Sequence, residues 1–168
     1  AWTYNGQVPG PTIRATHGDL VRVHFVNQGA HPHTIHFHGW HHPDMDGSLS
    51  HHQVMPGKDF TYEFEADPAG LHLYHCHAVP LKRHIHKGLY GTFIIDPRGG
   101  RPPADELVMM MNGFDSNFDN ENEVNVAAST DPGSRAGRNG FGWHSSSAGI
   151  EWRRTFATID SRHSGGAC

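Results

Sequence analysis

Residues 74–77, Tyr74-His75-Cys76-His77, place one thiol between two imidazoles on consecutive residues. Side chains alternate between the two faces of an extended strand, so His75 and His77 are predicted to point to one face and Cys76 to the other. A metal ion bound by Cys76 and metal ions bound by the two histidines would lie on opposite sides of one strand. This stretch therefore predicts two different metal sites joined by few covalent bonds, which suits electron transfer.

A second pair of strand-spaced histidines supports this interpretation. His36 and His38 flank Phe37, so their rings are expected on one face of a strand, about 6–7 Å apart at the backbone. If the two strands are neighbours in a sheet, the four imidazoles converge and can hold more than one borderline metal ion. The alternative for residues 75–77 is a buried free cysteine beside surface histidines, and the second pair argues against it.

Cys76 needs further ligands on its own face. His84 follows in the chain, a loop over Pro80–Arg83 is expected to return it toward the thiolate, and His33 lies near the start of the other histidine-bearing strand. Two histidines and one cysteine in a trigonal site with a weak axial ligand are typical of blue-copper electron-transfer proteins. Leu89 in the axial position cannot ligate, and an apolar shell there makes the centre a stronger oxidant.

The composition excludes several classes of protein and emphasises metal binding. Histidine makes up 17 of 168 residues, and all but His144 and His163 lie before residue 99, spread over several segments. A net charge of -4 and a pI near 6.5 predict no basic surface for nucleic acid. No apolar run approaches the roughly 20 residues of a membrane helix. Two cysteines are too few for a disulfide framework.

Short alternating segments separated by Gly and Pro turns predict β-strands. Residues 20–27 and 59–65 alternate most clearly, and further strands are expected over 71–76 and 88–95. The apolar residues expected on buried faces of the first two segments are Val21, Val23, Phe25, Phe60, Tyr62 and Phe64. Without an amphipathic helix, residues 1–98 are predicted to form an antiparallel β-sandwich of about seven or eight strands.

The composition changes after Arg98. Residues 99–124 are interpreted as a linker followed by the start of a second domain, with one more strand over residues 106–112. In residues 125–168, more than half of the positions are Gly, Ser, Ala or Arg, and neither a strand nor a helix period is sustained. This segment is predicted to be an irregular, disordered tail.

The stretches His33-Thr34-Ile35-His36-Phe37-His38-Gly39 and His75-Cys76-His77 through His84 to Leu89 resemble the copper motifs of multicopper oxidases. Residues 5–13, Asn5-Gly6-Gln7-Val8-Pro9-Gly10-Pro11-Thr12-Ile13, are similar to the family's first-domain signature. The resemblance covers residues 1–123 and is closest to two-domain, laccase-like members whose first cupredoxin domain carries the type 1 copper. It implies an all-β, cupredoxin-like Greek-key β-sandwich, followed here by the irregular C-terminal tail.

The same resemblance implies a role for each ligand. Type 1 copper would be bound by His33, Cys76 and His84, with Leu89 in the axial position as a non-ligating residue. Type 2 copper would be bound by His36, and the type 3 pair by His38, His75 and His77. Such a protein oxidises phenolic or metal-ion substrates one electron at a time and reduces O₂ to water at the trinuclear cluster.

The first domain supplies half of the histidines that this cluster requires. The resemblance implies that the others come from a second cupredoxin domain, normally in a neighbouring subunit of a homotrimer, and that the protein is secreted or periplasmic. The likeness stops near Asn125, so the second domain is expected to be truncated or out of frame. Activity is therefore expected to depend on assembly.

Alternative functions stay open from the sequence. A relative of copper nitrite reductases would share the type 1 site, although His77 is better explained by a type 3 pair. A single-domain blue-copper electron carrier would use the Cys76 site alone, and a zinc-sequestering protein would not need that cysteine. Asp46 is read equally well as a proton relay or as part of an Asp-Gly turn. Simple solvation is as good an interpretation as a role at the substrate edge or in binding extra metal ions for His41, His42, His51, His52 and His86.

Overall fold

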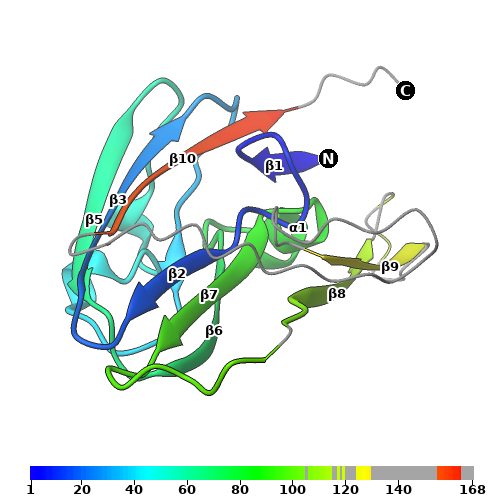
Figure 1. The fold of residues 1–168 in the computed structure, drawn as a ribbon. Coiled ribbons are helices and arrows are strands. Elements are labelled where there is room, and N and C mark those ends of the chain that lie inside the picture. The colour runs from blue at the N-terminus through cyan, green and yellow to red at the C-terminus, as the bar shows by residue number, and fades with distance from the viewer. Residues whose placement is uncertain (105, 115–116, 118, 120–123, 130–154, 164–168) are drawn as a thin grey trace.

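The computed structural model describes residues 1–104, 106–114, 117, 119, 124–129 and 155–163. Within these residues, two four-stranded sheets pack face to face, with strand orders β1-β10-β3-β5 and β2-β7-β6-β4 (Figure 1). The strands are β1 (Trp2–Tyr4), β2 (Ile13–Thr16), β3 (Leu20–Asn27), β4 (His36–Phe37), β5 (Asp59–Glu65), β6 (Gly70–His75), β7 (Tyr90–Asp96), β8 (Met109–Phe114), β9 (Val124–Ser129) and β10 (Thr155–His163). Strands β8 and β9 pair with each other as a separate sheet.

The alternating segments form the strands that the sequence predicts. In β3, the side chains of Val21, Val23 and Phe25 are fully buried, because they face the opposite sheet. Strand β5 runs antiparallel to β3 and buries Tyr62. Phe60 lies on the same face as Tyr62, with the two rings 4.8 Å apart, but near the start of this edge strand it stays 36% exposed and is not buried as expected.

The centre of the core is aromatic. The ring of Phe37 in β4 lies 5.6 Å from Tyr62 and 4.9 Å from Phe64 in the first sheet, and 5.9 Å from both Tyr74 and Phe93 in its own. Aromatic pairs favour tilted contacts at these centroid distances. Because Phe37 faces the core, the residues on either side of it face the other way, which fixes the orientation of His36 and His38.

The all-β fold class is confirmed, and the strand directions are mixed. The sequence predicts an antiparallel sandwich, but β2 pairs with β7 in parallel, and β10 pairs with β3 in parallel. Strand β2 is followed along the chain by β3 in the opposite sheet. Its hydrogen-bonded neighbour β7 therefore comes from a distant part of the chain, and no hairpin forces the two strands to run in opposite directions.

The expected loop over residues 80–83 is instead the beginning of a short helix, α1 (Leu81–His86). Pro80 occupies the N-cap position, and the Lys87 N–H donates to the carbonyl oxygen of Arg83 at the C-terminal end. Six residues are too few to show a helical period in the sequence. Two short 3₁₀ turns, η1 (Pro43–Met45) and η2 (Ser50–His52), lie between β4 and β5.

The sequence predicts no regular structure after Asn125, yet β9 and β10 lie in this part of the chain. Strand β10 inserts between β1 and β3, so its backbone groups gain partners that its composition does not reveal. Residues 130–154 and 164–168 lie outside the described residues. The proposed domain boundaries at 98 and 124 stay a prediction.

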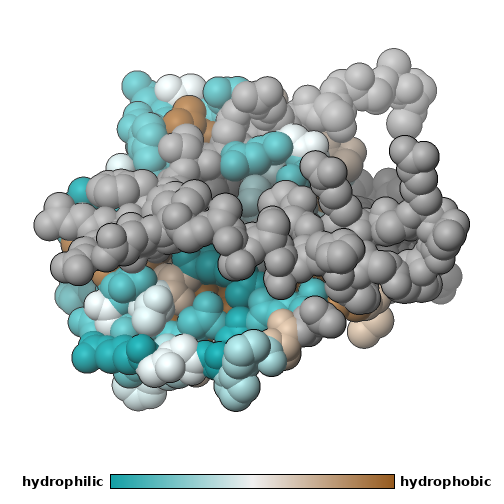
Figure 2. Space-filling view, in the orientation of Figure 1, coloured by the Kyte–Doolittle hydropathy of each residue, from teal (hydrophilic) through white to brown (hydrophobic). Residues whose placement is uncertain are grey.

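The described surface seen in Figure 2 is largely hydrophilic, with small separate hydrophobic areas. None of the helices in the described part of the chain is long and apolar enough to cross a membrane.

Candidate metal centre

Three buried side chains, those of His33, Cys76 and His84, meet inside the sandwich. The Nδ1 atom of His84 lies 3.1 Å from the Cys76 Sγ, the Nδ1 atom of His33 lies 3.7 Å from it, and the two nitrogens are 3.1 Å apart. Protein–metal bonds measure about 2.0–2.1 Å to imidazole nitrogen and about 2.3 Å to sulfur, with zinc as the reference. The three atoms are therefore spaced so that one ion can contact all of them.

Backbone hydrogen bonds hold these ligands in place. His33 exchanges two backbone bonds with Val54, at 3.1 and 2.9 Å. The Cys76 N–H donates to the carbonyl oxygen of Leu89, and the Leu89 N–H donates to the carbonyl oxygen of His84. Leu89 is fully buried and ties the cysteine to the helix that carries His84. Its axial position stays a prediction.

The chemistry of this donor set fits a soft or borderline cation. Burial raises the pKa of the Cys76 thiol to about 11, although the Thr34 N–H, 3.4 Å from Sγ, opposes the shift. A buried thiolate without a nearby positive charge is costly, whereas a bound cation favours the deprotonated form. Thiolate with two imidazoles in a dry pocket matches the ligand preference of copper in electron-transfer sites.

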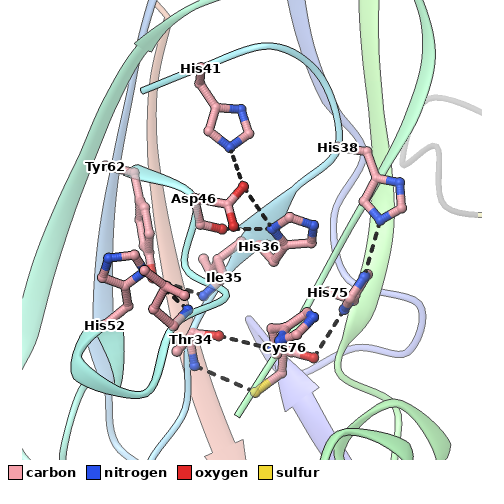
Figure 3. A network of polar contacts seen from close by, with 12 residues as sticks. Thr34, Ile35, His36, His38, His41, Asp46, His52, Tyr62, His75 and Cys76 are labelled. Atoms are coloured by element: carbon pink, nitrogen blue, oxygen red, sulfur yellow. Dashed lines mark hydrogen bonds and ion pairs between the residues drawn. The ribbon is translucent and has the colours of Figure 1, made fainter. Parts of the chain in front are cut away.

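The second group of histidines lies at the neighbouring edge of the sheet (Figure 3). Strands β4 and β6 are paired so that His36 is opposite His75, and the Nε2 atoms of His38 and His75 are 3.1 Å apart. The ring of His77 lies 5.8 Å from that of His75 and 5.2 Å from that of His36. The two strand-spaced pairs therefore converge, on the side opposite to the Cys76 thiol.

The environments of His38 and His75 favour neutral imidazoles. Burial lowers the pKa of His75 to about 4, with the nearby His36, His38 and His77 adding to the shift. Burial also lowers the pKa of His38, again with a contribution from His36. Neutral imidazole is the form that ligates metal ions, so these histidines are ready to bind at neutral pH.

Thr34 connects the two groups. Its N–H points to the Cys76 sulfur, and its hydroxyl oxygen accepts a 2.9 Å hydrogen bond from the backbone N–H of His77. The Tyr4 hydroxyl in turn donates to the carbonyl oxygen of Thr34 at 2.7 Å. The two groups thus share the same two short segments of backbone, and His84 is added to the buried group from α1.

Sequence reasoning did not find the partners of His36. Its Nδ1 donates to the backbone carbonyl oxygen of Asp46 at 2.7 Å, and the Asp46 carboxylate lies 3.0 Å from Nε2 of His41, whose side chain is only 3% exposed. Burial works against ionisation of Asp46, but a hydrogen bond from Ser48 and the nearby histidines lower its pKa. His36, His41 and Asp46 also lie close enough together to hold a metal ion.

The Asp-Gly sequence signals only the turn that makes this contact possible. Gly47 has φ +69, and a Cβ there would lie 2.0 Å from the carbonyl oxygen of Ile35. Only glycine fits this close approach, which brings Asp46 beside the histidine strand. Three candidate metal-binding groups are found among the described residues. The remaining loop histidines lie outside all three groups: His42, His51, His52 and His86.

Comparisons with known proteins agree with this geometry. A sequence profile of the family described as multicopper oxidase matches residues 1–100. Over 114 residues the chain is 35% identical to the copper-containing nitrite reductase of Neisseria meningitidis, covering 67% of this chain and 29% of that protein. Over 108 residues it is 44% identical to the L-ascorbate oxidase of Cucumis sativus, covering 58% of this chain and 17% of that protein.

Solved structures show the same likeness. A crystal structure of a multicopper oxidase has 55% identity and a TM-score of 0.73, covering 76% of this chain and 46% of that one. The blue copper oxidase from Nitrosomonas europaea has 33% identity and a TM-score of 0.62, covering 75% and 45%. The chain thus spans less than half the length of each of these relatives.

Proposed function

Because this chain belongs to the multicopper oxidase family, we propose that it is part of a copper-dependent, laccase-like oxidoreductase. The proposed enzyme oxidises phenolic or metal-ion substrates one electron at a time and reduces O₂ to water. The observation that carries this proposal is the adjacency of two unlike ligand groups, with Cys76 facing one and its neighbours His75 and His77 belonging to the other. The same adjacency allows electrons to pass between the two groups along very few bonds.

We assign type 1 copper to the buried group, with His33, Cys76 and His84 as ligands and Leu89 in the axial position without ligating. Copper bound there supplies one-electron redox chemistry. The chain excludes water from the site, since all four side chains are buried, and the Thr34 N–H stabilises negative charge on the sulfur. An apolar axial side chain disfavours the more highly charged oxidation state, which makes the site a stronger oxidant.

We assign the partly exposed group to the trinuclear cluster. His36 is proposed as the type 2 ligand, and His38, His75 and His77 as the type 3 ligands. The hydrogen bond from His36 Nδ1 to Asp46 fixes the ring so that Nε2 carries the free lone pair. These histidines are half of the proposed ligand set, so the remainder must come from a second cupredoxin domain, which we place in a neighbouring copy within a homotrimer. A secreted or periplasmic location is part of the same proposal.

A second candidate is a relative of copper nitrite reductases, favoured by the 35% identity to that enzyme of Neisseria meningitidis. That reading requires only one catalytic copper beside the type 1 site. The position of His77 favours the oxidase, because its ring lies within the histidine group and a single catalytic copper would not need it as a ligand.

Three measurements on the purified, copper-loaded chain test the proposal. They are the copper content, the visible spectrum and O₂ uptake with a phenolic donor. The oxidase predicts a thiolate charge-transfer band and additional copper bound at the histidine group, with O₂ uptake in the assembled protein. Nitrite reduction without O₂ uptake in that protein would favour the second candidate. A copper-loaded protein with no thiolate band would refute the type 1 assignment.

A further inference from the structure

The indole of Trp2 covers the buried ligand group. Its ring lies 4.9 Å from that of His84 and 5.2 Å from that of His33, edge-on to both. His33 is 0% exposed and His84 is 4% exposed, whereas Trp2 reaches the surface with 8% of its area. The indole therefore packs directly against both imidazoles, and Trp2 is more exposed than either histidine.

Two cations lie over the same indole. The guanidinium carbon of Arg83 is 5.6 Å from the ring centroid, and the Lys87 ammonium is 5.5 Å from it. Both distances are within the range of cation–π attraction. The backbone N–H of Trp2 donates a 2.7 Å hydrogen bond to the carbonyl oxygen of Lys87, so β1 is fixed beside the end of α1 (Figure 1).

We propose that Trp2 is the relay through which electrons reach the buried copper site, and that Arg83 and Lys87 make this relay selective for anionic one-electron donors. The proposal rests on the proposed function, in which His33, Cys76 and His84 hold type 1 copper. The relay also narrows the substrate class of the proposed function. Phenolates and other anionic reductants become the preferred electron donors at this face, and cationic metal ions become poor ones.

The electron count of the step is simple. The donor loses one electron, the copper site gains it, and Trp2 ends unchanged; a phenol also releases its proton to solvent. The two nearby cations disfavour a positively charged, oxidised indole, so Trp2 serves as a packed medium for electron tunnelling rather than as a stable radical. Close packing matters because a gap in place of the ring would interrupt this medium.

The test follows anaerobic bleaching of the thiolate band of the copper-loaded full chain in a stopped-flow instrument. Ferrocyanide serves as the anionic donor and hexaammineruthenium(II) as the cationic one. Trp2→Leu is expected to slow bleaching by both donors roughly tenfold, since it replaces ring contacts by a gap. Trp2→Phe keeps an aromatic ring and is expected to retain most of the rate. Trp40→Leu, at a tryptophan that is 77% exposed, is the matched control and should bleach like the wild type.

A separate double variant tests the selectivity for anionic donors. Arg83→Gln combined with Lys87→Gln should slow ferrocyanide several-fold, flatten the dependence of its rate on ionic strength, and leave hexaammineruthenium(II) as fast or faster. A readout independent of reduction is the quenching of tryptophan fluorescence by Cu(II), which should be smaller in Trp2→Phe because an indole in contact with His33 and His84 is gone.

The outcomes distinguish a failure of the type 1 copper assignment from a failure of the Trp2 relay. A wild-type chain that binds copper without a thiolate band overturns the copper assignment and this proposal together. If the band forms and Trp2→Leu, with that band unshifted, bleaches at the wild-type rate, only the relay is overturned. Equal salt dependence in the wild type and the Arg83/Lys87 double variant overturns the selectivity for anionic donors.

Discussion

The Nε2 atom of His41 lies 3.0 Å from the carboxylate of Asp46, in a contact where the histidine side chain is almost completely buried. The backbone carbonyl of the same aspartate accepts the hydrogen bond from His36. His41 therefore acts on the histidine group through another residue, because it holds the turn that orients a proposed ligand (Figure 3).

His41→Ala should loosen this turn and weaken copper binding at the histidine group by about 10–100-fold, the usual effect of removing an outer partner of a metal ligand. The thiolate band should remain, since His41 does not contact the Cys76 site. Copper titration followed by visible and EPR spectra measures both. His42→Ala, at the exposed neighbouring position, is the control. Equal affinities in the two variants would show that the His41–Asp46 contact does not support the site.

Cys76→Ser should abolish the blue colour of the copper-loaded protein together with any oxidase activity. The colour arises from charge transfer between thiolate and Cu(II), and a hydroxyl cannot replace the buried thiolate. Absorption spectra of the copper-loaded Cys76→Ser variant are compared with those of Cys168→Ser, the control that keeps the buried Cys76 thiol. A blue band that survives in Cys76→Ser would exclude this residue as the copper ligand.

Leu89→Met should keep the colour and lower the reduction potential. A thioether in the axial position donates weakly to the metal and favours its oxidised form, while the similar volume limits the loss of stability to under about 1.5 kcal/mol. Redox titration of the blue band gives the potential. Leu71→Met, at a leucine that is 74% exposed, should leave it unchanged. If Leu89→Met leaves the potential at the wild-type value, Leu89 is not axial.

The metal-free chain should lose stability as the pH falls from about 6.5 to about 4. Burial lowers the pKa of His75 to about 4, whereas a histidine in the unfolded chain has a pKa near 6.5. Over this range the unfolded chain binds a proton that the folded chain does not, so stability rises with pH and is lost on acidification. Urea unfolding at pH 7 and pH 5 measures it. His75→Asn should reduce the difference; the same difference in both proteins would rule out His75 as its source.

The grouping of the proposed metal ligands was predictable because strand alternation is a local rule. His75, Cys76 and His77 need only an extended backbone to face opposite sides, and Phe37 between two histidines orients the second pair by being buried. Sequence reasoning could therefore place all these residues in two groups before any strand pairing was known.

Other features depend on contacts between distant residues. The helix that carries His84 is only six residues long, too short for a helical period to appear. The contact between His41 and Asp46 forms through a turn whose closeness to Ile35 is a matter of tertiary packing. Strand β10 is defined by its neighbours β1 and β3, and its own Ser- and Arg-containing sequence gives no sign of them.

The oxidase activity is expected to depend on assembly. The reduction of O₂ to water needs a site that collects several electrons without releasing partly reduced oxygen. The described chain presents one buried ligand group and one partly exposed histidine group, in which His38 lies at the surface. An isolated chain leaves open coordination positions on any metal bound at that edge, so it should bind type 1 copper well and oxidise phenols weakly or not at all. A homotrimer, or an added second domain that brings the remaining histidines, should restore the activity.

Dilution across the range in which the oligomer dissociates tests this dependence on assembly. Phenol oxidation is measured per chain, and the mass is determined in parallel. The blue band should persist through the dilution, which separates loss of assembly from loss of type 1 copper. High specific activity that stays constant in a proven monomer would mean that one chain completes the oxygen-reducing site by itself.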